Sequence, residues 1–75
     1  MEELLEILNK IKPGVDFESE KDLIGGHVLD SFSIIRLVSD LEEEFDITIT
    51  PLDIIPDNFK SADAIYAMVQ RLEDE

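Results

Sequence analysis

Apolar residues recur at helical spacing near both ends of the chain. The first stripe, spaced i, i+3, i+4 and i+7, consists of Leu4, Ile7, Leu8 and Ile11. It predicts an amphipathic helix over residues 2–11, which ends at Lys12-Pro13-Gly14 because proline and glycine favour turns. The last stripe consists of Ile65, Met68, Val69 and Leu72. It predicts a helix whose N-terminus is capped by Ser61.

A helix is also predicted over residues 31–45. Its core stripe consists of Ile34, Val38, Leu41 and Phe45, with Leu37 alongside. Because successive helical residues are about 100° apart, the four stripe residues gather within about 40° of Ile34. Residues turned away from that stripe, at about 80° to 200°, are Phe32, Ile35, Arg36, Ser39, Glu42 and Glu43. Exposed apolar side chains among charges suggest a docking face for a partner, although Phe32 could equally cover a neighbouring loop.

The connection from Pro13 to Asp30 shows no sustained period but carries many apolar residues. A structureless connection of that length is uncommon in a small domain. We expect it to lie across the helices with Phe17 and Leu23 packed against the core, and with a short helical turn. Gly25 and Gly26 allow the backbone to turn just before residue 31.

The sequence between residues 46 and 56 contains a second, shorter connection. Ile47 and Ile49 alternate with polar residues like a strand, but no second run is available to pair with them, so we expect an extended connector. Thr50-Pro51-Leu52-Asp53 is typical of an N-cap followed by a first-turn proline and acid, which predicts a short helix that Pro56 stops. Three long helices and one short helix make an all-α, four-helix bundle, predicted to be a single domain over residues 1–75.

Composition narrows the function of this bundle. With 19 acids against six bases, the net charge of −13 argues against nucleic-acid binding and against an anionic membrane surface. No cysteine and a single histidine, His27, leave little for a metal site, so none is predicted. The acidic N-terminus does not resemble a signal peptide, and no uncharged stretch exceeds seven residues. We therefore expect a cytoplasmic monomer, attracted to partners with basic patches and stabilised by salt.

The stretch Leu29-Asp30-Ser31-Phe32 stands at a helix start, and LEEEF begins ten residues after Ser31, followed by DITI. The chain resembles the acyl carrier protein family over nearly its whole length. The resemblance lies in these motifs and their spacing, in the acidic charge and in the order of the helices. The family motif is D-S followed by Leu, Met or Phe at the start of the second helix.

The resemblance implies a carrier without catalysis of its own. Ser31 would receive 4′-phosphopantetheine from coenzyme A through a Mg²⁺-dependent phosphopantetheinyl transferase. The arm would then carry acyl or aminoacyl groups as thioesters between loading and transferring enzymes. By the same resemblance Asp30 would assist the transferase, and the second helix would be read by partners.

Two positions depart from fatty-acid carriers, which commonly read D-S-L-D with a further acid along the helix. Ser33 and Arg36 stand where those acids would be. The VLDSF motif is closer to that of carriers loaded with amino acids, such as D-alanyl carrier proteins, or to that of carriers of specialised pathways.

Two rival interpretations remain open at the level of sequence. Ser31 is, on the helix signal alone, most simply an N-cap, so the chain could be an unmodified acidic adaptor that only binds partners. An enzyme would instead use His27 and Ser31 as base and nucleophile, but no oxyanion hole or enclosed pocket is evident in the sequence.

Overall fold

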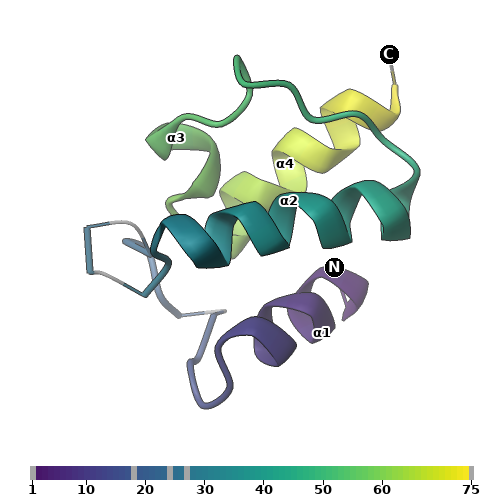
Figure 1. Ribbon diagram of the computed structural model, residues 1–75. Coiled ribbons are helices and arrows are strands. Elements are labelled where there is room, and N and C mark those ends of the chain that lie inside the picture. The colour runs from purple at the N-terminus through teal and green to yellow at the C-terminus, as the bar shows by residue number, and fades with distance from the viewer. Residues whose placement is uncertain (1, 18, 24, 27, 75) are drawn as a thin grey trace.

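The described residues form four helices, and the sequence predicted the three long ones. The computed structural model describes residues 2–17, 19–23, 25–26 and 28–74. In these residues α1 spans Glu2–Ile11, α2 Ser31–Phe45, α3 Pro56–Phe59 and α4 Ala62–Glu73, and no strand is assigned (Figure 1). The all-α bundle is therefore confirmed. Ser61 caps α4 as predicted, because its hydroxyl accepts the Ala64 backbone N–H at 3.1 Å.

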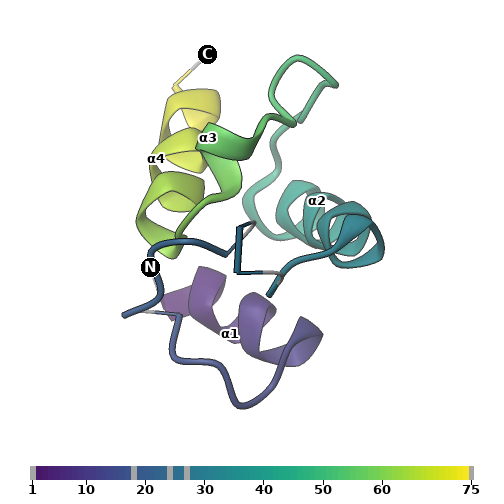
Figure 2. The same ribbon diagram turned by 90° about the vertical axis from the view of Figure 1, so that its left-hand side faces the viewer.

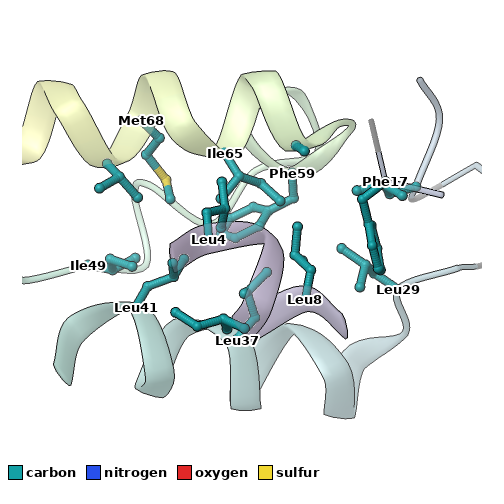
Figure 3. Close-up of a cluster of buried hydrophobic side chains, with 14 of the residues drawn as sticks. Leu4, Leu8, Phe17, Leu29, Leu37, Leu41, Ile49, Phe59, Ile65 and Met68 are labelled. Atoms are coloured by element: carbon teal, nitrogen blue, oxygen red, sulfur yellow. The ribbon is translucent and has the colours of Figure 1, made fainter. Parts of the chain in front are cut away.

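The core lies where α1, α2 and α4 face one another. Leu4 and Leu8 of α1, Leu37 and Leu41 of α2, and Ile65 of α4 are fully buried there. Figure 3 shows these side chains pointing toward one another between the three helices. α1 packs mainly on α2, and α3 packs mainly on α4. This arrangement leaves one side of α2 free of helix contacts, as the end-on view in Figure 2 shows.

The rotation of α2 differs from the predicted one. Leu37, predicted to lie beside the stripe, is fully buried and Ser33 is buried too, whereas Ile34, Val38 and Phe45 are only half-buried. The buried side of α2 is thus turned from Ile34 toward Leu37. Packing against α1 sets this rotation, which apolar periodicity alone does not resolve.

The long connection packs as predicted. Phe17 is 3 % exposed and Leu23 is fully buried. A hydrogen-bonded turn forms at Asp16, whose carbonyl accepts the N–H groups of Ser19 and Glu20. Ile24 lies outside the described residues.

The prediction for α3 was wrong. Residues 51–53 form a hydrogen-bonded turn, and the short helix begins at Pro56 instead of stopping there. Asp53 Oδ2 accepts the Thr50 backbone N–H at 3.2 Å and the Thr50 hydroxyl at 3.1 Å, so the predicted cap residues do pair. The turn cannot continue as a helix because Pro56 forces Ile55 into an extended conformation (φ −125°, ψ 153°). Ile47 and Ile49 are buried in the connector, as predicted.

Candidate functional site

Asp30, and not Ser31, caps the N-terminus of α2. Asp30 has extended backbone angles (φ −101°, ψ −176°), and its Oδ1 accepts the Ser33 backbone N–H at 2.8 Å. Its carbonyl accepts the Ile34 N–H at 2.9 Å, which starts the helical ladder. The interpretation of Ser31 as an ordinary N-cap is therefore wrong. The adjacent aspartate occupies that role and leaves the serine as the first helical residue.

The Ser31 hydroxyl is available for modification. The residue is exposed, and its oxygen takes part in no hydrogen bond among the described residues. The first N–H groups of a helix lack acceptors within the helix, and the helix dipole makes this end electropositive. An exposed hydroxyl in that field suits a phosphodiester, so the residues present fit a phosphopantetheine attachment.

The segment before Ser31 is anchored through one buried residue. The Leu23 N–H donates to the Lys60 carbonyl at 2.8 Å, between α3 and α4. The Leu23 carbonyl in turn accepts the N–H groups of Val28 at 2.9 Å and Leu29 at 3.0 Å. Leu29 is itself buried at 4 % exposure. The chain that leads into the site is thus fixed to the connection between α3 and α4.

A glycine permits the turn within this anchor. The Gly26 N–H donates to the Asp22 carbonyl at 2.8 Å. A Cβ at position 26 would stand 2.8 Å from that same carbonyl oxygen, which is closer than real Cβ atoms come. Gly26 is therefore required by close backbone approach.

The capping bond also sets the ionisation of the site. The Ser33 backbone N–H lowers the pKa of Asp30 below the usual 3.8, with help from the Ser33 hydroxyl and the Lys12 charge, against a smaller opposing effect of desolvation. Asp30 is therefore ionised at neutral pH. This carboxylate next to Ser31 offsets part of the positive end of the helix dipole.

The outward side of α2 exposes most of the predicted docking residues. Phe32 is 85 % exposed and Ile35 is 69 % exposed. Arg36, Ser39 and Glu43 are exposed as well. The side of α2 that carries these five residues is hereafter the docking face.

Glu42 differs from the other predicted docking residues. It is half-buried, and its Oε2 accepts the Ile49 backbone N–H at 2.9 Å. Its carboxylate therefore ties the connector to α2. The three consecutive glutamates gave no signal of this, because the acceptor role depends on where residue 49 comes to lie.

An apolar groove lies beside α2; the sequence suggested a shallow groove for a short acyl chain but gave neither its size nor its lining. It has a volume of about 190 Å³ and is lined by Ile34, Ile54, Ile55, Pro56 and Phe59. Ile54 and Ile55 are 41 % and 44 % exposed, although both are large and apolar. Two adjacent isoleucines in a polar connection were the signal that could have revealed the lining.

The rival interpretation of His27 and Ser31 as a catalytic pair is not tested by this geometry, because His27 lies outside the described residues. Among the described residues no group of three or more His, Asp or Glu side chains is placed to hold a metal ion. No helix in the same part of the chain is long and apolar enough to span a membrane.

Comparison with known proteins shows the family of the chain. Residues 2–72 match the family model described as "Phosphopantetheine attachment site". The chain belongs to the phosphopantetheine-attachment-site family. This carrier domain is similar to the D-alanyl carrier protein of Lactococcus lactis subsp. lactis, with 30% identity over 99% of the chain and 96% of the relative. It is 32% identical, with the same coverage, to the D-alanyl carrier protein of Lactococcus lactis subsp. cremoris (strain MG1363). No solved structure gives a significant match.

Family membership confirms several predictions. The carrier domain is a non-catalytic protein whose cofactor is covalently attached 4′-phosphopantetheine. It interacts with transferases and acyl-processing enzymes, as carriers of this family do. The enzyme interpretation is thereby set aside.

Proposed function

We propose that Ser31 carries the 4′-phosphopantetheine and that the domain is an aminoacyl carrier whose cargo is D-alanine. The observation that supports the attachment residue is the exposed Ser31 hydroxyl at the first position of α2, relieved of capping by Asp30. The support for the cargo is that relatives aligned over 99% of the chain are D-alanyl carrier proteins.

Ser31 acts in this proposal as a nucleophile toward coenzyme A. Its Oγ forms a phosphodiester bond to the pantetheine-side phosphorus, adenosine 3′,5′-bisphosphate leaves, and a base of the transferase accepts the hydroxyl proton. The Ser33 N–H is already bonded to Asp30, so the N–H groups of Ser31 and Phe32 are the ones that would face the new phosphodiester charge. When attached, the arm supplies a terminal thiol that holds the aminoacyl group as a thioester. The chain itself has no cysteine and therefore no thiol of its own.

The remaining residues serve recognition in this proposal. Asp30 lies beside the modified serine for the transferase, and the docking face contacts the loading enzyme, with Glu42 at its margin. The domain extends over residues 1–75 and acts in the cytoplasm as a monomer.

A second cargo is favoured by the apolar groove. Ile34 and Ile55 line a space of about 190 Å³ in which a short acyl chain would be shielded from solvent. D-alanine has only a methyl side chain and gains little from such a space. A carrier of short acyl groups is therefore the alternative.

Attachment is tested by intact-mass spectrometry after incubation with coenzyme A, Mg²⁺ and a broad-specificity transferase. The wild type should gain the mass of one phosphopantetheine, and Ser31→Ala should gain none. Ser19→Ala, at an exposed serine outside the docking face, is the matched control and should gain the full mass. If the wild type stayed unmodified while a known carrier was modified, the chain would be an unmodified adaptor.

Cargo is tested with the modified protein, ATP and an adenylating enzyme that activates D-alanine. We expect thioester-bound D-alanine, released by hydroxylamine. To test the alternative, short acyl groups are attached enzymatically and thermal stability is compared with that of the uncharged form. Stabilisation that grows with chain length, without D-alanine charging, would favour the acyl carrier.

A further inference from the structure

We infer that the enzyme that loads this carrier presents a carboxylate to Arg36, close to its active-site entrance, and basic side chains to the acids farther along α2. The inference rests on the proposed function and deepens it, because it specifies the chemistry of the partner surface. A partner with only a basic patch would offer no group of opposite charge to Arg36.

The charges of α2 are divided between its two halves. Residues 31–39 contain one charged side chain, that of Arg36. The acids of α2 all come later, at Asp40, Glu42, Glu43 and Glu44. In a chain of net charge −13, Arg36 is thus the one charged residue between the capping Asp30 and Asp40, while the later half of the helix is negative. Complementary partners must show the reverse order of charges.

Arg36 is available to a partner. Its side chain is 65 % exposed, and its one ion pair among the described residues joins Nε to Asp40 Oδ2 at 3.9 Å. The guanidinium has five N–H donors, so both terminal nitrogens can bind a carboxylate in a bidentate manner. Asp40, at 34 % exposure, orients the arginine from its Nε side.

The hollow beside Arg36 holds charges of both signs. Arg36 lines a polar hollow of about 300 Å³ between α1 and α2. Lys10 of α1 lines the same hollow, so two of the six bases of the chain meet there. The acids on the wall of the hollow are Asp40, Glu43 and Glu44. Residues 40 to 44 follow Arg36 along α2, so the positive groups lie at the end nearer Ser31.

The spacing along the helix defines the partner surface further. Arg36 and Glu43 are seven residues apart, about 10.5 Å along the helix axis. Phe32 and Ile35 stand exposed on the Ser31 side of this pair of charges. The partner therefore needs an apolar recess next to its active-site entrance, then an acid, and then bases about 10 Å farther on.

The test is the charging of modified carriers with D-alanine by the adenylating enzyme and ATP. The variants are Arg36→Glu, Arg36→Gln and, as the matched control, Arg71→Glu on the exposed surface of α4. We expect Arg36→Glu to lower kcat/KM for the carrier by about tenfold or more and Arg36→Gln to lower it less, with kcat unchanged. Arg71→Glu has the same change of charge and should leave kcat/KM near the wild-type value.

The outcomes separate this inference from the proposed function. Wild-type or faster charging of Arg36→Glu would overturn the inference alone, because the partner would then present no acid there. Lack of charging of the wild type would overturn the proposed function and the inference with it. Each variant is first modified by the broad-specificity transferase and verified by intact mass, so a loss of charging cannot arise from a missing arm.

A cross-link identifies the acid directly. In Arg36→Lys a carbodiimide can join the new amine to a carboxylate in direct contact, with loss of one water. We expect an amide between position 36 and an Asp or Glu of the adenylating enzyme, mapped by peptide mass spectrometry. Cross-links to the enzyme through Lys10 or Lys21, with none at position 36, would contradict the inference.

Discussion

Asp30 couples the stability of α2 to pH. Its carboxylate accepts the Ser33 N–H, and this bond lowers the pKa of Asp30 below 3.8. A group with a lowered folded-state pKa stabilises the fold fully above its unfolded pKa and loses that contribution as pH falls through the folded value. Because the other acids also titrate, the effect has to be read as a difference between variants.

We predict that Asp30→Ala lowers the melting temperature at pH 7 and that its gap to the wild type narrows as pH falls below 3.8. Asp30→Asn keeps an acceptor that does not titrate, so its advantage over Asp30→Ala should persist in acid. Circular dichroism melts between pH 7 and 2 measure both differences. A gap between wild type and Asp30→Ala that stayed constant over this range would contradict the role given to Asp30.

Glu42 fixes the connector after α2. Its carboxylate accepts the Ile49 N–H at 2.9 Å, next to a buried isoleucine. We predict that Glu42→Ala costs about 1–2 kcal/mol of unfolding free energy, since it leaves that N–H without its charged acceptor. Glu43→Ala, its exposed neighbour, is the control and should change stability by less than about 0.5 kcal/mol. If urea denaturation gave equal losses of unfolding free energy for the two variants, the structural role of Glu42 would be contradicted.

At the scale of the element, the two sides of α2 have different tasks. Leu37 is fully buried, so Leu37→Ala should cost about 2–5 kcal/mol. Phe32→Ala and Ile35→Ala remove exposed side chains and should change stability by about 0.5 kcal/mol or less. The same two variants should lower the rate at which loading enzymes charge the carrier. If Phe32→Ala destabilised the fold as much as Leu37→Ala, Phe32 would be part of the packing and not of the docking face.

At the scale of the whole molecule, the net charge of −13 opposes the compact state. We predict that added salt raises the melting temperature, because it screens repulsion among exposed carboxylates. Mg²⁺ should act at lower concentration than NaCl, and an equal concentration of a neutral osmolyte is the control for non-electrostatic effects. The same screening should slow association with basic partners. A melting temperature that did not respond to salt would show that self-repulsion is negligible here.

The sequence alone determined the bounds of α1 and α2 and the cap of α4, because stripe periodicity and the residues that end a helix are local signals. It also marked Phe17, Leu23, Ile47 and Ile49 as buried, since so many apolar side chains in connections need a core to pack against. The site at residues 30–32 is marked by a sequence motif, which does not depend on packing.

Tertiary structure decided what local chemistry leaves ambiguous. Asp30 and Ser31 can each cap a helix, and the path of the preceding segment, anchored through Leu23, places Asp30 at the cap. Pro51 and Pro56 can each begin a helix, and the structure shows that the helix begins at Pro56. The rotation of α2, the hydrogen bond between Ile49 and Glu42 and the groove beside Ile34 all depend on how separate segments of the chain pack together. These features arise from contacts between elements, which no local pattern of residues records.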